Sequence, residues 1–162
     1  MTDLVWHVAH LRPRTEKKVS AFCLREGIAH TLPLYRSVKR YRGKQLVFFK
    51  PLFPNYLFLQ IAPALRSVVQ QHDHVANLLE PPDQAEFVTQ LGDILRALDG
   101  MAEVRLAPQV TEGLLVRIKS GPLRGLEGLV VQRQGMMEVV LRLDFIGQAA
   151  AVKVMADEVE AA

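Results

Sequence analysis

The sequence predicts an α+β protein in which a mixed α/β sandwich is followed by a small β-barrel. Three observations predict it. Helix-like and strand-like apolar spacings alternate through residues 1–99. Residues 100–111 have no clear periodicity and contain Pro108, as is typical of a linker. Short strand-like segments separated by glycines fill residues 112–162, which favours a barrel without open sheet edges.

The first domain is expected to contain elements in the order β-α-β-β-β-α-β-α. Alternating apolar residues predict a first strand around Trp6, and Thr15 is placed to cap a helix that ends at Gly27. The other elements are a hairpin at 30–50 that turns at Arg42-Gly43-Lys44, a strand at 56–61, a short helix at 64–71, a strand at 75–79 and a helix closed by Gly100. This order predicts a small mixed sheet with helices packed on it and the strand at 56–61 at its centre.

The predicted barrel has five short strands. They cover residues 114–119, 126–132, 137–143 and 149–155, with a last short segment at Val159. Glycines stand between them, and glycine allows the positive φ that tight turns need. β-Branched residues and glycines are dense in this part of the chain, which favours strands over helices.

The composition indicates a folded protein that does not span a membrane. Hydrophobic residues make up 49% and charged residues 23% of the 162 residues, and no apolar run reaches the roughly 18 residues of a membrane-spanning helix. The start of the chain lacks a signal-peptide pattern, and a lone cysteine suits a reducing cytoplasm. Residues 1–99 hold 13 basic and 9 acidic side chains, whereas residues 100–162 hold 7 and 8. Only the first domain is therefore expected to approach a polyanion.

Three aromatic residues stand close together at Phe53, Tyr56 and Phe58, although aromatic residues make up only 7% of the chain. In a strand, Tyr56 and Phe58 point to one face, and Leu57 and Leu59 point to the other. If helices cover the leucine face, the aromatic face is left for a protein partner. The alternative is that both faces belong to the core.

A basic stretch lies in the predicted hairpin. It has no acidic residue between Arg36 and Lys50, and Tyr35 and Tyr41 are interleaved with its basic side chains. Such a hairpin can contact phosphates without reading sequence, and its tyrosines can stack on unpaired bases. The alternative is a solvated hairpin whose charges prevent aggregation at its edges. The predicted nucleic-acid contacts are Arg12, Arg14, Arg36, Lys39, Arg40, Arg42 and Lys44.

Three features carry a resemblance to a known family. The spacing of glycines and apolar residues at 113–130 resembles the KOW motif, which ribosomal proteins also use. Trp6, the octapeptide Pro-Leu-Phe-Pro-Asn-Tyr-Leu-Phe at 51–58 and this KOW-like segment follow one another in the order found in the NusG family of bacterial transcription factors. The octapeptide and Arg42-Gly43-Lys44 look most like RfaH, a specialised paralogue within that family. The resemblance covers nearly all of residues 4–159.

The resemblance implies a monomeric factor of the bacterial cytoplasm. Its first domain would bind the β′ clamp helices of RNA polymerase, hold the clamp closed and suppress pausing by favouring the moving state of the enzyme. The positions that match the family's contact surface are Val8, His10, Phe53, Tyr56 and Phe58. At His10, family members typically have Tyr.

RfaH also contacts the non-template DNA strand and the β gate loop of the polymerase. Arg12 matches one of its basic DNA-facing positions. Residues 65–75 depart from the RfaH pattern, with Asp73 or His74 where RfaH has a basic residue and Ser67-Val68-Val69 at the gate-loop contact. Recognition of a specific DNA element therefore does not follow from the resemblance.

The second domain of NusG binds Rho or NusE, and NusE is also a ribosomal protein. The residues here that match this binding site are Phe145 and Ile146. In RfaH the same domain can fold as a helical hairpin that masks the polymerase site. The strand-forming composition of this chain predicts a barrel instead, so an isolated 105–162 fragment should not give a mainly helical circular dichroism spectrum.

No pattern of catalytic residues stands out. The sequence lacks a glycine-rich phosphate loop, a Ser-His-Asp order and paired carboxylates, so we expect neither an enzyme nor a bound cofactor. His72 and His74 can ligate a metal, but two such histidines without a nearby cysteine are usually surface residues, so we expect no metal site. Cys23 lies on the apolar side of a predicted helix and is expected in the core.

Three functions stay open on the sequence alone. They are an antitermination factor, a general NusG-type factor that assists Rho-dependent termination, and a ribosome-associated KOW protein that binds RNA. The excess of acidic residues in the second domain argues against the last.

Overall fold

The computed structural model divides into two compact units. It describes residues 3–100, 103–108, 113–133 and 135–162. The N-terminal unit consists of Met1–Pro33 and Phe53–Gln84, and the C-terminal unit consists of Leu34–Leu52 and Ala85–Ala162. No helix in the described part of the chain is long and apolar enough to cross a membrane.

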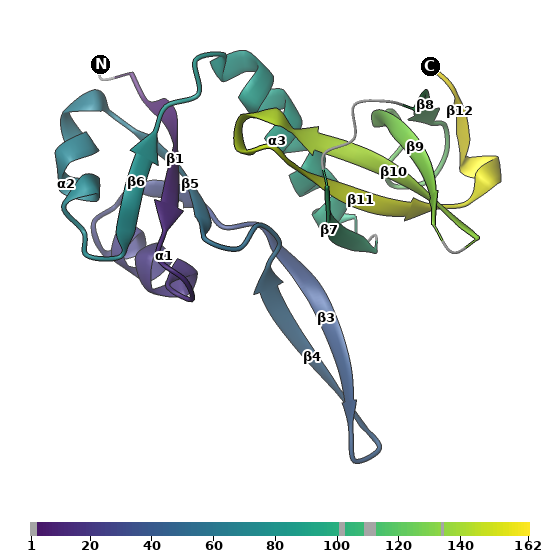
Figure 1. Ribbon diagram of the computed structural model, residues 1–162, viewed down its shortest axis with the longest axis horizontal. Helices are drawn as coiled ribbons and strands as arrows, with labels where there is room; N and C mark the ends of the chain where they lie inside the picture. The colour runs from purple at the N-terminus through teal and green to yellow at the C-terminus, as the bar shows by residue number, and fades with distance from the viewer. Residues whose placement is uncertain (1–2, 101–102, 109–112, 134) are drawn as a thin grey trace. The chain divides into compact units, whose positions relative to one another are not determined.

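A four-stranded sheet organises the N-terminal unit, with strands in the order β2-β5-β1-β6. Figure 1 labels three of them, β5, β1 and β6. The strands are β1 (Val5–Leu11), β2 (Ala29–Thr31), β5 (Tyr56–Ile61) and β6 (Val75–Leu79). The helical elements are α1 (Glu16–Arg25), the 3-10 turn η1 (Pro63–Leu65) and α2 (Arg66–Gln70). Helix α1 ends before Gly27, which has a φ of 68° and stands just after the helix C-cap, as predicted.

The core of this unit lies on the face of the sheet that α1 and α2 cover. Ala9 and Leu57 project from β1 and β5 and pack with Val19 and Cys23 of α1 and Val69 of α2. All five are fully buried, because alternate residues of a strand point to the same face. Burying a side chain the size of valine or leucine contributes about 1.5–3 kcal/mol.

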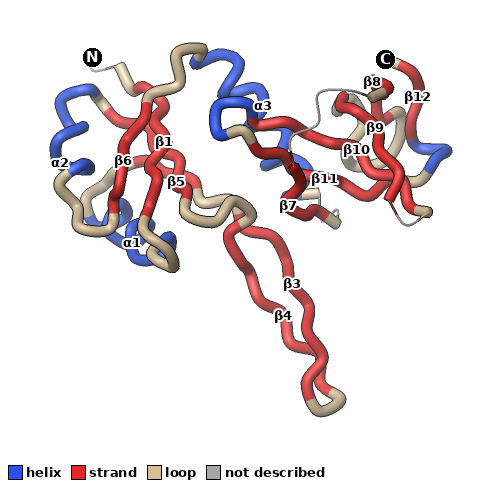
Figure 2. Tube along the Cα trace, in the orientation of Figure 1, coloured by secondary structure: helices blue, strands red, loops and turns tan. Residues whose placement is uncertain are grey.

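The strands β3 (Leu34–Tyr41) and β4 (Lys44–Pro51) form a separate two-stranded hairpin in the C-terminal unit (Figure 2). They pair without interruption from Leu34 opposite Pro51 to Tyr41 opposite Lys44. The connecting residues Arg42 and Gly43 have φ values of 51° and 75°, the left-handed geometry of two-residue hairpin turns. The predicted hairpin and its turn are therefore confirmed.

The rest of the C-terminal unit contains a helix and a six-stranded antiparallel sheet. Helix α3 (Gln84–Asp99) buries one stripe made of Phe87, Leu91, Ile94 and Ala97. The sheet has the order β12-β8-β9-β10-β11-β7. Its strands are β7 (Val104–Pro108), β8 (Leu114–Ile118), β9 (Glu127–Arg133), β10 (Met136–Leu143), β11 (Gln148–Val154) and β12 (Val159–Ala161), with the 3-10 turns η2 (Asp144–Ile146) and η3 (Ala156–Glu158).

The structure corrects the predicted sheet of the N-terminal half. Every strand pair in its described residues is antiparallel, so the sheet is not mixed. The hairpin does not join it. The order of helices and strands along a chain does not fix strand direction, which depends on how the connections cross the sheet. Thr15 precedes α1 as predicted, but its hydroxyl donates to the backbone oxygen of Arg12 at 2.7 Å and does not cap the helix.

The segment 100–111 was predicted as a linker, and the structure places strand β7 within it. This strand pairs antiparallel with β11. Arg105 also donates two hydrogen bonds to the buried carboxylate of Glu138, at 2.7 and 2.9 Å. Residues 101–102 and 109–111 lie outside the described part. Pro108 is typical of a loop and masked the short apolar pattern before it, so this strand was not predicted.

Candidate functional site

The five predicted polymerase contacts lie on one face of the N-terminal sheet. Register places Val8 opposite Phe58 and His10 opposite Tyr56 on the neighbouring strands β1 and β5. Residues directly opposite in an antiparallel pair point to the same face. Phe53 completes the group, because its ring meets Phe58 edge-on with 6.2 Å between ring centroids. Side chains far apart in the sequence are thereby brought together.

These five side chains differ in exposure. Val8, Phe53 and Phe58 are at most 1% exposed, so they belong to the core. His10 is exposed and Tyr56 is half-buried, and their rings stack with centroids 5.1 Å apart. The expectation of an accessible aromatic face therefore holds at Tyr56, whereas Phe53 and Phe58 fit the alternative in which both faces are core.

A left-handed turn at Asn55 fixes the entry to β5. Asn55 has a φ of 72°, a conformation that asparagine adopts more readily than most residues. Its backbone N–H donates to the Oε2 atom of Glu16 at 2.9 Å, and its carbonyl accepts from the backbone of Leu11 at 2.7 Å. Glu16 is buried at the start of α1 and positions this turn. Glu16 could not be identified from the sequence, because an acidic residue in the first turn of a helix is common and does not indicate this contact.

The five basic residues predicted on the hairpin are all exposed. They are Arg36, Lys39 and Arg40 on β3, Arg42 in the turn and Lys44 on β4. The guanidinium carbon of Arg42 lies 5.3 Å from the centroid of the Tyr41 ring. The nearby side chain of Lys50 lowers the pKa of Lys39, through a hydrogen bond and through charge repulsion. The hairpin therefore presents concentrated positive charge.

The two other predicted nucleic-acid contacts, Arg12 and Arg14, belong to the N-terminal unit. Both are exposed after β1. The Nε atom of Arg12 donates to the backbone oxygen of Asp73 at 2.9 Å, which ties the arginine to the loop before β6. The predicted basic residues thus fall on both units.

Phe145 and Ile146 lie in the turn η2, between β10 and β11, and are half-buried. Helix α3 contacts this turn. The ring of Phe87 meets Phe145 edge-on with 6.3 Å between centroids. Gln90 accepts from the backbone N–H of Asp144 and donates to its carboxylate, both at 2.9 Å. Gln90 was not identified from the sequence, because a polar residue on a helix does not reveal which loop it meets.

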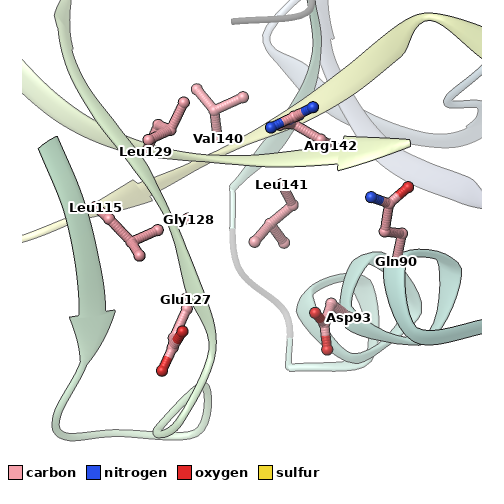
Figure 3. Close-up of a pocket in the computed structure, with 9 residues that line it drawn as sticks. All are labelled: Gln90, Asp93, Leu115, Glu127, Gly128, Leu129, Val140, Leu141 and Arg142. Atoms are coloured by element: carbon pink, nitrogen blue, oxygen red, sulfur yellow. The ribbon is translucent and has the colours of Figure 1, made fainter. Parts of the chain in front are cut away.

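A cavity of about 310 Å³ lies beside this contact, between α3 and strands β8, β9 and β10 (Figure 3). Gln90 and Asp93 line it from the helix. Burial raises the pKa of Asp93, and the carboxylate of Glu127 raises it further, whereas Arg96 lowers it. Glu127 and Arg142 line the cavity from the strands, so its charged groups come from both α3 and the sheet.

The remaining candidates do not assemble into a reactive centre. His72 and His74 have ring centroids 5.3 Å apart, and Phe22 packs against His72. No cluster of three potential metal ligands occurs among the described residues. Cys23 is fully buried, as predicted, and burial raises its pKa to about 11, which disfavours the reactive thiolate.

A family model described as NusG, transcription termination factor, matches residues 4–95. The match covers more than half of the 162 residues and includes β1, the hairpin, the turn at Asn55 and most of α3. The chain belongs to the NusG family. NusG-family proteins are transcription elongation and termination factors and not enzymes, and their partner is RNA polymerase. No curated protein matches this NusG-family sequence.

Proposed function

We propose that this NusG-family protein is a specialised elongation and antitermination factor, similar to RfaH, that binds the β′ clamp helices of RNA polymerase. Its clamp-contact residues are Val8, His10, Phe53, Tyr56 and Phe58. The observation that supports this most is the register of β1 and β5, which gathers these positions on one sheet face. The stacked rings of His10 and Tyr56 form its accessible part.

Binding at the clamp suppresses pausing without any bond-making step. A factor that binds the moving state of the polymerase more tightly than the paused state increases the population of the moving state. The effect is limited by the difference between the two affinities, and a tenfold preference corresponds to about 1.4 kcal/mol.

Contact with the clamp begins at His10 and Tyr56, because these two side chains are accessible. Val8, Phe53 and Phe58 are buried, so they take part only if the residues that shield them move. Aromatic residues such as these are common at the centres of protein interfaces.

A second polymerase contact, with the β gate loop, falls at Ser67-Val68-Val69 of α2. The non-template DNA strand passes the basic side chains of both units. These are Arg12, Arg14, Arg36, Lys39, Arg40, Arg42 and Lys44. Exposed basic residues attract the DNA backbone regardless of its sequence, which adds to the affinity for polymerase bound to DNA.

The C-terminal sheet is proposed to be a KOW domain at 112–162, joined to a polymerase-binding domain at 1–99. Five consecutive antiparallel strands with glycines between them support this assignment. Its turn η2 presents Phe145 and Ile146 to NusE, and thereby to a ribosome, or to Rho. The factor works as a monomer in the bacterial cytoplasm, where the polymerase is.

The clamp assignment is tested by pulling down core RNA polymerase with the parent protein and with His10→Ala plus Tyr56→Ala. These two residues are chosen because truncating the buried Phe58 would unfold the sheet. We expect at least a tenfold loss of retained polymerase, since two aromatic interface contacts are removed. Leu24→Ala, which is 77% exposed on α1, serves as the control and should bind like the parent. Equal retention by the double variant would remove the clamp assignment.

An alternative is a general factor that assists Rho-dependent termination, and the family description, a termination factor, favours it. Transcription through a Rho-dependent terminator, with and without Rho, decides between the two. When Rho is present, an antitermination factor should increase read-through, whereas a termination factor should lower it. Neither should change read-through when Rho is absent. A third alternative, a ribosome-associated RNA-binding KOW protein, predicts that an RNA duplex binds the C-terminal sheet, whose sequence has more acidic than basic residues.

A further inference from the structure

The outer part of the hairpin β3–β4 exposes both of its faces, and residues near its base are half-buried, among them Tyr35 and Lys50. The two faces differ in chemistry. Side chains directly opposite in the register share a face. One face, called here the tyrosine face, carries Tyr35, Ser37, Lys39 and Tyr41 of β3 with Lys44, Leu46, Phe48 and Lys50 of β4. The other, called here the arginine face, carries Leu34, Arg36, Val38 and Arg40 with Gln45, Val47, Phe49 and Pro51.

The tyrosine face alternates aromatic rings with ammonium groups along the ribbon. Its cross-strand pairs run from Tyr35 opposite Lys50, through Phe48, to Tyr41 opposite Lys44 at the tip. The rings of Tyr41 and Phe48 are 59% and 45% exposed. Successive pairs on one face are about 7 Å apart, because each residue of a strand advances about 3.4 Å. Tyr41 and Phe48 stand two pairs apart on this face, about 14 Å along the ribbon, which leaves room for a separate planar group on each ring.

The lysines of the tyrosine face have no acidic residue near them in the sequence. No Asp or Glu occurs between residues 27 and 72. Lys39 and Lys50 project from the same face, and the second ammonium group lowers the pKa of the first. Two like charges held together repel each other, and an anion placed between them relieves this repulsion. Phosphate is the anion that recurs along a nucleic acid chain.

We propose that the tyrosine face of the hairpin binds single-stranded nucleic acid, with bases stacked on Tyr41 and Phe48 and phosphates beside Lys39 and Lys50. This deepens the proposed function, because it assigns the strand and the face on which it lies. Stacking on an aromatic side chain requires an unpaired base, whereas in a duplex both faces of each base are already covered. The arginine face carries one aromatic ring and two cations, Arg36 and Arg40, whereas the tyrosine face carries three of each, so the arginine face fits a strand less well.

The test uses the full chain and fluorescence anisotropy with a labelled oligothymidine of about 20 nucleotides, a length that exceeds common single-strand site sizes. We expect Tyr41→Ala plus Phe48→Ala to weaken binding at least about tenfold. The matched control, Val47→Ala plus Phe49→Ala, removes one ring and one apolar side chain from the arginine face and should change binding less than about twofold. Thermal unfolding verifies that both variants fold, as the exposure of these residues predicts.

Two further measurements sharpen the assignment. Lys39→Gln plus Lys50→Gln should lower the slope of log affinity against log salt by about 1.4, the value for two phosphates on a single strand. A duplex of the same length should bind more weakly than the single strand. Equal losses from both faces, tighter binding of the duplex or an absence of binding by the parent protein would each overturn the inference.

The same variants separate this inference from the clamp assignment. Retention of core polymerase without nucleic acid should be unchanged in Tyr41→Ala plus Phe48→Ala, because neither residue is a clamp-contact residue. If polymerase retention is intact and oligothymidine binding is absent in the parent, the hairpin inference fails while the clamp assignment stands. If oligothymidine binding follows the tyrosine face and His10→Ala plus Tyr56→Ala leaves retention unchanged, the clamp assignment fails alone.

Discussion

The backbone of Asn55 is constrained both by its conformation and by its hydrogen bonds. Its backbone is left-handed, its N–H is held by Glu16 and its carbonyl by Leu11. Among the described non-glycine residues, Arg14 and Arg42 also have positive φ, and both lie in exposed turns. Asn55 differs because its turn joins two aromatic residues of the proposed clamp contact, Phe53 and Tyr56.

Replacing Asn55 tests whether its backbone conformation matters. Asn55→Ala should lower the free energy of unfolding by about 1–2 kcal/mol, because a Cβ opposes left-handed backbone and alanine gains no compensating hydrogen bond. Asn55→Gly should fold nearly as stably as the parent, since glycine adopts this conformation freely. Urea unfolding followed by circular dichroism measures both, with the exposed Asn77→Ala on β6 as control. A glycine variant as unstable as the alanine variant would contradict this account.

Cys23 is expected to be unreactive while the protein is folded. It is fully buried, and its pKa is raised to about 11, so the thiolate that attacks disulfide reagents is scarce near neutral pH. A chromogenic aromatic disulfide at about pH 8 should modify Cys23 only at the rate at which the chain opens, and quickly in urea. Rapid modification of the folded protein would show that the packing around α1 is looser than described.

At the scale of single elements, Gly92 and Gly128 differ in the space around their backbone. Gly92 lies in α3, and a Cβ added there meets no atom within 4 Å. Gly128 lies in β9, and a Cβ there would collide with the backbone oxygen of Val140 and lie 2.8 Å from Val139 Cγ1. Glycine at position 92 therefore destabilises α3, whereas glycine at position 128 lets the backbones of β9 and β10 approach each other closely.

Alanine at these two positions should therefore change stability in opposite directions. Gly92→Ala should raise the free energy of unfolding by about 0.5–1 kcal/mol, because alanine loses less conformational freedom in a helix. Gly128→Ala should lower it by about 1–3 kcal/mol, the usual cost of an overpacked interior. Denaturant titrations of the full chain provide both values. A destabilised Gly92→Ala variant would indicate that the exposed side of α3 meets another surface.

At the scale of the whole chain, α3 and the C-terminal sheet belong to one compact unit although the family match ends within α3. Polar contacts join them, with Gln90 bonded to Asp144 and Arg96 donating to the backbone oxygen of Arg124. Contacts of this kind respond to pH and salt, because charged groups change their solvation when the surfaces meet. Asp93 lies on the same helix, and burial raises its pKa.

The stability of the chain should depend on pH through Asp93. Its pKa is raised above 3.8 mainly by burial, so the folded chain binds this proton more tightly than the unfolded chain. The resulting stabilisation is complete below the unfolded pKa and is lost as pH rises through the folded pKa. Asp93→Asn cannot ionise, so it should gain stability relative to the parent over this window. Urea unfolding of both proteins at several pH values measures the difference, with the exposed Asp99→Asn as control. A difference that does not change with pH would contradict the assignment.

Local patterns predicted much of the fold and part of the site. Arg42-Gly43 predicted the hairpin turn, and Gly27 predicted the end of α1. The octapeptide at 51–58 indicated the family that the match to residues 4–95 confirmed. Each of these signals is carried by residues close in sequence, where backbone geometry and periodicity act directly.

The sequence by itself determined most of the elements, the family, and the position of Phe53, Tyr56 and Phe58 around one strand entrance. Only the tertiary structure decided that Phe53 and Phe58 are buried while Tyr56 stacks on His10, and that residues 104–108 add a strand to the C-terminal sheet. The physical reason is that the spacing of apolar residues along the sequence indicates only which side chains share a face. What covers that face, and which strand pairs with a free edge, depends on segments distant in the chain.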